Sequence, residues 1–217
     1  MKLKFFLLAC IIILIIPAYS QIGFSLQGGN FALEEDPSSN EIKTTDLQQF
    51  TAGISYQLAL KNVRIEFLPG IYAIYGKGKL ENADHFNRLG VQFSVPINFY
   101  LLDLGSDCNC PTFNKQGQAF EKGFHFFLLP GMLYLQHERI KSQGPERGAH
   151  FEYLVGLGLG FDFGLNRHST LSPFVYYSRH FNQHLDFNNL AQEWYKSSGQ
   201  SSFNAGIRYT WYMKKRR

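Results

Sequence analysis

Few side chains in this chain combine the residue types and the spacing that catalysis needs. Ser178 and His180 lie two residues apart, and in a β-strand this spacing puts both on one face, about 6.5–7 Å apart along the strand. A serine beside a histidine could form an activated nucleophile for acyl transfer. Such a pair also needs a carboxylate that orients the histidine. The sequence places none nearby, because Glu193 lies in the following loop and would have to fold back. We therefore expect no catalysis, and an enzyme is only the alternative.

Cys108 and Cys110 form a second pair whose chemistry depends on what surrounds it. Three interpretations stay open: a disulfide that is strained and easily reduced, a contact to a soft metal ion, or no special role. Two thiolates alone make an incomplete zinc site, and the nearest histidine in the sequence, His125, lies inside an expected strand. We therefore expect no metal site and no cofactor.

The elements that must position these residues are β-strands, because bulky apolar residues alternate with small or polar ones over long runs. From Phe50 to Leu60 every second residue is apolar, and all of these except Ala52 are bulky, whereas residues such as Thr51 and Gln57 lie between. The same pattern returns over 202–213. A period of two over about ten residues is typical of a tilted strand that crosses a bilayer.

Further runs of this kind bring the number of expected strands to eight, and an even number lets a closed single-chain barrel keep both termini on one side. The fold class is therefore all-β, an eight-stranded antiparallel up-and-down transmembrane β-barrel. We predict its strands at 22–32, 49–60, 63–75, 88–102, 122–137, 151–165, 171–183 and 202–213.

The connections between these strands alternate in length, as short periplasmic turns alternate with longer outer loops in such barrels. One connection departs from the rule, because the segment 103–121 falls on the short-turn side, is long and carries both cysteines. A long connection without structure of its own is functional or disordered. The long segments on the outer side are 33–48, 76–87, 138–150 and 184–201.

Residues 1–20 read as a cleaved secretory signal, with a charged start at Lys2 and Lys4, an apolar run, and small residues before an expected cleavage after Ser20. The rest, 21–217, suits one domain. A formal net charge of +4 is too small to indicate binding to nucleic acid. The chain contains no P-loop, dinucleotide fingerprint or paired CxxC motif.

Alternation alone does not separate a membrane barrel from a soluble lipocalin-like ligand-binding barrel, which turns its bulky face inward. The polar face decides, because over 151–165 it is built around Gly156, Gly158 and Gly160, and small residues suit a crowded interior. A Lys or Arg facing the middle of a bilayer costs about 2–4 kcal/mol, and the bulky faces of the strands at 88–102 and 151–165 carry neither. We therefore expect lipid outside, with aromatic residues near strand ends as candidates for the interfacial belt. These candidates are Tyr56, Tyr75, Tyr100, Tyr134, Tyr153, Tyr209 and Trp211.

Four charged residues fall on the inward face near the periplasmic ends of their strands: Arg64, Glu66, Asp162 and Arg208. The interior of an eight-stranded barrel is about wide enough for side chains alone, and an unpaired charge there is costly. We predict ion pairs among the four residues that form a structural plug. A gated ion path through the same residues is the alternative.

Three stretches carry a resemblance to known proteins: Ala-Tyr-Ser-Gln at 18–21, the glycine-rich opening 22–29, and the glycine-alternating run 155–160. Through them the chain resembles the PorT-like and OmpA-like outer-membrane β-barrel families that are common in Bacteroidota. The resemblance implies a role in envelope integrity, adhesion or secretion support, and it supplies no catalytic motif. One departure is the basic tail 214–217, which follows the aromatic last strand.

We therefore expect an integral barrel of the cell outer membrane with a structural, adhesion or interaction role. Its partners are expected to be outer-membrane lipid and a periplasmic or extracellular protein, bound through 103–121 or the outer loops. The alternatives are a small barrel enzyme that acts on envelope lipid, and the soluble ligand-binding barrel.

Overall fold

The computed structural model describes residues 21–33, 44–60, 63–80, 85–101, 123–141, 144–166, 168–181 and 200–212. Their regular structure is one sheet of eleven strands. In chain order these are β1 (Gln21–Leu33), β2 (Thr44–Ala59), β3 (Ile65–Phe67), β4 (Gly70–Leu80), β5 (His85–Ser94), β6 (Ile97–Phe99), β7 (Phe124–Lys141), β8 (Gly144–Phe161), β9 (Phe163–Asn166), β10 (Ser169–Phe181) and β11 (Gln200–Tyr212). Within these ranges, no helix has the length and hydropathy to cross a membrane.

The eleven strands make eight passes along the barrel, because three passes are interrupted. β3 and β4 are separated at Leu68 and Pro69, β5 and β6 at Val95 and Pro96, and β8 and β9 at Asp162. A proline has no N–H to donate to a ladder, which explains the first two gaps. The neighbouring groups still bond across them, since the Leu68 N–H donates to the Pro96 carbonyl at 2.8 Å.

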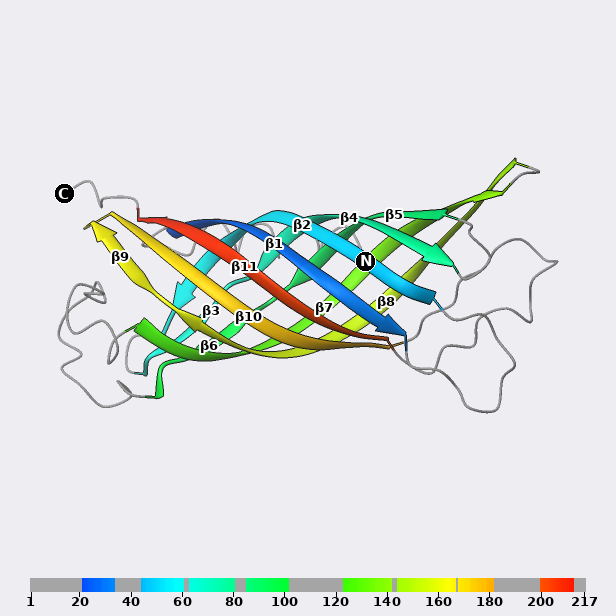
Figure 1. Cartoon of the computed structure of the whole chain (residues 1–217). Coiled ribbons are helices and arrows are strands. Elements are labelled where there is room, and N and C mark those ends of the chain that lie inside the picture. The colour runs from blue at the N-terminus through cyan, green and yellow to red at the C-terminus, as the bar shows by residue number, and fades with distance from the viewer. Residues whose placement is uncertain are drawn as a thin grey trace, which may run out of the picture.

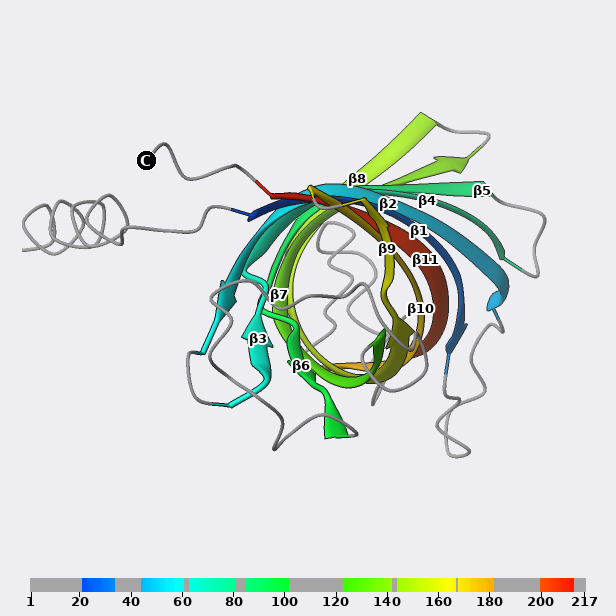
Figure 2. The same cartoon turned by 90° about the vertical axis from the view of Figure 1, so that its left-hand side faces the viewer.

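The sheet closes on itself, and Figure 2 shows the resulting ring along its axis. β1 pairs antiparallel with β2 on one side and with β11 on the other, and the remaining passes pair with their neighbours in sequence. The predicted eight-stranded antiparallel up-and-down barrel is therefore confirmed. We call the end where Gln21 pairs with Tyr212 the terminal rim, and the opposite end, where β7 turns into β8, the hairpin rim.

The bulky residues face outward, as the alternation predicted. On β10, Val175, Tyr177 and Arg179 are exposed on the outer face, whereas His125 on β7 is buried inside. A soluble barrel would turn its bulky row inward, so the lipocalin-like alternative is wrong and the barrel spans a membrane. The exposed apolar residues include Leu26, Phe50, Ile54, Ile71, Leu89, Val91, Phe151, Leu157, Phe203 and Ile207.

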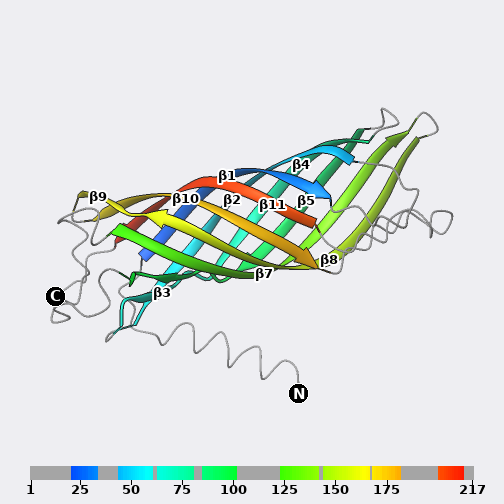
Figure 3. The same cartoon turned by 60° about the horizontal axis from the view of Figure 1, so that its bottom comes forward.

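The strands extend further toward the hairpin rim than the sequence predicted. The segment 138–150, expected as a long loop, is mostly strand, because β7 and β8 stay paired up to Lys141 and Gly144. The strands were predicted from alternating apolar residues, and the polar ends of β7 and β8 lack this pattern. Their backbones are nevertheless paired. Figures 1 and 3 show the β7–β8 hairpin reaching beyond the ends of β10 and β11.

Candidate functional site

The middle of the lumen is filled by apolar side chains, which the sequence did not lead us to expect. They come from β4, β7, β8 and β10, and Phe174 packs against them. Most are large residues on the inward face of β7, a strand with bulky residues on both faces. The cluster consists of Ile74, Phe127, Leu129, Leu133, Leu135, Leu154 and Tyr176.

On the terminal-rim side of this apolar layer, the four predicted lumen charges gather around Tyr100. The Tyr100 hydroxyl lies 2.6 Å from Asp162 Oδ2 and 2.8 Å from Glu66 Oε2, so one phenol group bridges two carboxylates. Arg208 Nη2 lies 3.9 Å from Asp162 Oδ1, and the Arg64 guanidinium lies 4.7 Å from the centre of the Tyr100 ring. We call these five residues the Tyr100 cluster, and all of them are buried.

Two further residues contribute to the Tyr100 cluster from the two strands, β7 and β10, that flank the pass of β8 and β9. The Ser172 hydroxyl donates a hydrogen bond to Asp162, and His125 Nδ1 lies 4.0 Å from Asp162 Oδ1. Asp162 therefore receives contacts from several strands at the point where β8 and β9 are interrupted, which makes it the centre of the plug that we propose.

Tyr100 itself corrects a prediction, because we expected it in the interfacial belt and it is completely buried in the lumen. The sequence contained a signal for this, because Tyr100 lies two residues after the polar residue Asn98, which is also buried inside, and residues two apart in a strand share one face. We had assigned Tyr100 to the belt because it lies near a strand end, without regard to the face on which it lies. The other belt candidates are half-buried or exposed on the outside.

We predict that Arg208→Ala weakens the barrel, because it leaves Asp162 with less compensation for its buried charge. The expected result is a lower temperature at which the purified protein loses its unheated migration on a gel. Arg179→Ala is the matched control, since Arg179 is exposed on the outer face. Equal losses of heat resistance for both variants would contradict a structural role for the Tyr100 cluster.

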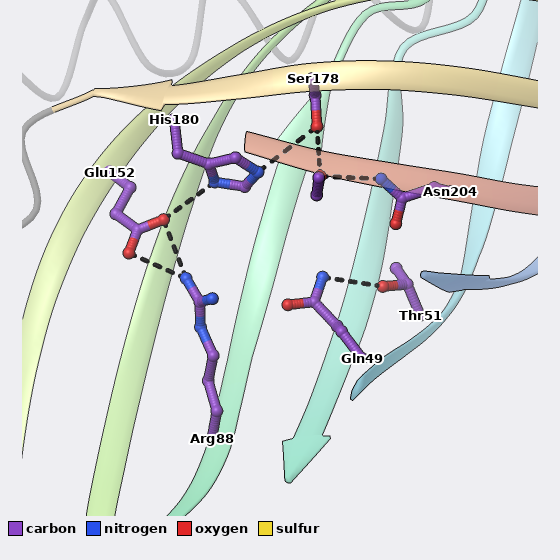
Figure 4. A network of polar contacts seen from close by, with 8 residues as sticks. Gln49, Thr51, Arg88, Glu152, Ser178, His180 and Asn204 are labelled. Atoms are coloured by element: carbon purple, nitrogen blue, oxygen red, sulfur yellow. Dashed lines mark hydrogen bonds and ion pairs between the residues drawn. The ribbon is translucent and has the colours of Figure 1, made fainter. Parts of the chain in front are cut away.

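On the hairpin-rim side of the apolar layer lies a second polar group, which we call the Arg88 network (Figure 4). It consists of Arg88, Glu152, His180, Ser178, Ser202 and Asn204, all buried. Arg88 Nη2 donates to both carboxylate oxygens of Glu152, at 2.8 and 2.9 Å. The Asn204 amide donates to the Ser202 hydroxyl at 2.8 Å.

The Arg88 network supplies the carboxylate that the sequence did not place beside Ser178 and His180. His180 Nδ1 lies 3.0 Å from Glu152 Oε2, and Ser178 Oγ lies 3.4 Å from His180 Nε2. Glu152 faces inward by parity, but only the register of β8 against β10 shows that it reaches His180. Glu193, which we had weighed for this role, lies outside the described residues.

Ser178, His180 and Glu152 are connected in the same sequence as the members of a catalytic triad. Their other contacts, however, hold the serine and the glutamate in a different network. The Ser178 hydroxyl lies 2.7 Å from the Ser202 hydroxyl, closer than it lies to His180. Arg88 already binds the Glu152 carboxylate. Ser178, Glu152 and His180 have at most 2% of their surface exposed, so in this arrangement a substrate carbonyl cannot approach the serine.

The structure bears on the predicted absence of a metal site only for the residues that it describes. Among the residues that the structure describes, no group of three or more His, Cys, Asp and Glu side chains could hold a metal ion. Cys108 and Cys110 lie outside the described residues, as do the segment 103–121 and the expected signal 1–20.

Comparison with known proteins gives likenesses in structure only. No protein-family model and no curated protein matches the chain, so the PorT-like resemblance and the source in Bacteroidota stay predictions. Neisserial surface protein A is similar at 10% identity and TM-score 0.45, covering 88% of this chain and 96% of that one. Ail of Yersinia pestis, solved with a heparin analogue, is similar at 9% identity and TM-score 0.46, covering 88% and 99%. The outer membrane enzyme PagL is similar at 14% identity and TM-score 0.41, covering 85% and 97%.

All three TM-scores are below 0.5, so function has to be argued from this chain's own residues. The closed ladder leaves no backbone edge in the bilayer, and the exposed apolar belt surrounds it. Closed barrels of this kind are the outer-membrane form of membrane protein. The protein is an integral β-barrel of the outer membrane.

Proposed function

We propose that this barrel is a cell-surface interaction protein that neither conducts nor catalyses, and that the β7–β8 hairpin contacts its partner. The observation that carries the proposal is a free strand edge. β8 pairs with β7 along its whole length, but with β10 only from Tyr153 to Gly160. Within the described residues, positions 144–152 of β8 therefore have a strand on one side only.

A free edge presents a row of backbone N–H and C=O groups that accept another extended chain. Adding a strand to such an edge is a common mode of peptide recognition, in which backbone hydrogen bonds supply the affinity. The free edge of β8 is longer than a typical strand. It lies between the hairpin rim and the level of the exposed aromatic residues Tyr134 and Tyr153. A partner strand would therefore arrive from the aqueous side of the barrel.

The proposal is tested by placing a photo-crosslinking residue at Ala149, which is exposed on the free edge. The matched control is Gln136, which is exposed on β7 and pairs directly with Ala149, but lies in a strand that β5 covers on its other side. In intact cells we expect a protein adduct at Ala149 and at least tenfold less at Gln136. Adducts of equal yield at the two positions would contradict recognition through the edge.

A proline in the edge separates backbone recognition from side-chain contact. Gly148→Pro removes one N–H and should abolish the Ala149 adduct, whereas Gly148→Ser should keep it. Both variants must still show the unheated gel migration of a folded barrel. Undiminished crosslinking in the folded proline variant would sink the proposal.

We also predict that the protein conducts at background level in planar bilayers. The lumen contains two buried polar groups and the apolar cluster between them, and a cavity of about 30 Å³ beside Tyr72, His125 and Arg208 has room for about one water. Steady open channels from purified protein, absent from a detergent-only control, would refute a closed lumen and support the gated path instead.

The alternative of an enzyme that acts on envelope lipid rests on Ser178. Because its hydroxyl is buried and bonded to Ser202, we expect that Ser178→Ala leaves the acyl pattern of outer-membrane lipid unchanged by mass spectrometry. Ser202→Ala is the control for loss of the same hydrogen bond. A change of acyl pattern with Ser178→Ala but not with Ser202→Ala would show that the serine reacts.

A further inference from the structure

A row of incomplete backbone pairs crosses four neighbouring passes of the barrel wall. In an antiparallel ladder, residues directly opposite each other exchange two hydrogen bonds in every second pair. Each of the three pairs in this row keeps one bond and lacks the other, because one member is a proline and has no N–H. The remaining bonds run from the Tyr56 N–H to the Pro69 carbonyl, from Leu68 to Pro96 and from Val95 to Pro130, at 2.9, 2.8 and 3.0 Å. We call this row the proline seam.

Between the proline seam and the terminal rim lie two short segments, 64–67 and 97–100, which we call the terminal flap. They contain β3 and β6, which pair with each other and lie side by side in Figure 2. The ladders that attach the flap are short, since β6 pairs with β7 from Ile97 to Phe99, and β3 pairs with β2 at Glu66 and Phe67. A small unit beyond a weakened row can open locally while the rest of the barrel stays folded.

Tyr100 joins the terminal flap to the passes beside it. Its hydroxyl lies 2.8 Å from Glu66 Oε2, within the flap, and 2.6 Å from Asp162 Oδ2, outside the flap. The centre of its ring lies 5.0 Å from that of His125 on β7. Because the phenol group connects two carboxylates that would otherwise repel each other, it holds the flap closed.

Asn98 has the opposite effect on the closed flap. Its side chain is completely buried, and among the described residues neither its amide nitrogen nor its amide oxygen has a hydrogen-bond partner. A buried polar group without a partner costs free energy, and contact with water would remove that cost. The flap therefore carries one residue that stabilises the closed position and one that destabilises it.

The lumen cavity of about 30 Å³ lies directly behind the proline seam. Pro96 forms part of its wall, together with Ser25 on β1. Phe127, Leu129 and Tyr176 of the apolar cluster also line it, and they separate it from the hairpin rim. Opening of the terminal flap would therefore expose the cavity, but not the lumen beyond the apolar cluster.

We propose that the terminal flap is a lid that moves on the proline seam, with Tyr100 as its latch. The open lid admits water and small neutral molecules to the cavity from the aqueous phase at the terminal rim. It opens one end of the lumen only, so the barrel does not conduct. The lid goes beyond the surface interaction proposed above and needs no partner on the β7–β8 hairpin.

The test measures how fast a thiol in the cavity wall is alkylated. Ser25→Cys is introduced into a full-length chain whose native cysteines are replaced by serine, and the barrel in lipid vesicles is treated with iodoacetamide. Tyr100→Phe removes the latch and should raise the alkylation rate, followed by mass spectrometry, at least tenfold. The control reporter is Ser202→Cys, buried on the other side of the apolar cluster, where Tyr100→Phe should change the rate less than twofold.

Two variants should have the opposite effect. Pro69→Ala supplies an N–H to the proline seam and does not touch the cavity, and Asn98→Leu removes the unpartnered amide. Each should lower the alkylation rate of Ser25→Cys about threefold or more. Pro173→Ala is the matched control, since Pro173 lies in β10 outside the seam, and should leave the rate unchanged. All barrels are checked by their unheated gel migration.

Hydrogen exchange tests the lid in the unmodified protein. The backbone amides of Phe67 and Phe99 should exchange at least tenfold faster than those of Phe24 and Tyr209, which pair with each other near the same rim. Exchange in the flap that is no faster than at Phe24 overturns the proposal. So does an alkylation rate of Ser25→Cys that Tyr100→Phe leaves unchanged, or one that rises equally at Ser202→Cys.

Discussion

Glu152→Gln lowers the free energy of unfolding of the barrel by about 3–5 kcal/mol, the range observed when one partner of a buried ion pair is removed. The cause is Arg88, whose guanidinium is almost completely buried and bonds to both carboxylate oxygens. With a neutral amide in place of the carboxylate, Arg88 keeps a full charge in the lumen, and one of the two oxygens that contact Arg88 and His180 is replaced by an NH2 group, which cannot accept a hydrogen bond. Urea unfolding of the barrel in lipid vesicles measures the loss.

Two variants identify the lost charge pair as the cause. Glu138→Gln, on the half-buried outward face of β7 beyond the belt, should cost less than about 1 kcal/mol, as exposed pairs do. Replacing both partners, with Arg88→Met and Glu152→Leu, should recover much of the stability, because the desolvation cost of two charges disappears with them. If the double variant is less stable than Glu152→Gln alone, the Arg88 network contributes through its hydrogen bonds rather than its charges.

The fold was predictable because the period of two reports which solvent each face meets. This alternation places Arg208 and Asp162 inside and Ile207 outside. It also places Tyr100 inside, although we had assigned Tyr100 to the interfacial belt because it lies near a strand end. Parity along one strand does not show which inward residues meet across the lumen. That depends on register and tilt, so the contact of Glu152 with His180 could not be derived from the sequence.

The filling of the lumen was the larger gap in the prediction. β7 has bulky residues on both faces, and only its partners show that Phe127 and Leu129 have room inside. The room comes from the glycines of β8: Gly158 lies opposite Phe127 in the ladder, and Gly156 lies opposite Leu129. The glycines that we took as a sign of a crowded interior therefore leave space for large side chains on the neighbouring strand.

Gly158→Ala tests this complementarity and is the second large effect that we expect. A Cβ at position 158 would overlap the Phe127 ring and lie 2.6 Å from both Tyr176 Cβ and the Val175 carbonyl oxygen. A side chain can turn away, but the carbonyl belongs to the ladder between β8 and β10. We expect a loss of about 1–3 kcal/mol or more in the same urea titration, as overpacked cores show, with a smaller folded fraction after refolding.

The backbone clash makes this prediction specific. If the Phe127 ring were the whole obstacle, Phe127→Leu would rescue Gly158→Ala, whereas the Val175 carbonyl predicts that the double variant recovers only part of the loss. Gly28→Ala is the matched control, because a Cβ there meets nothing closer than 3.6 Å, at Phe50 on the outer wall, and should be neutral or slightly stabilising. Equal costs at Gly28 and Gly158 would mean that glycine acts through chain flexibility at both positions. A cost at Gly158 alone would show that the lumen is tightly packed where Phe127 and Tyr176 meet β8.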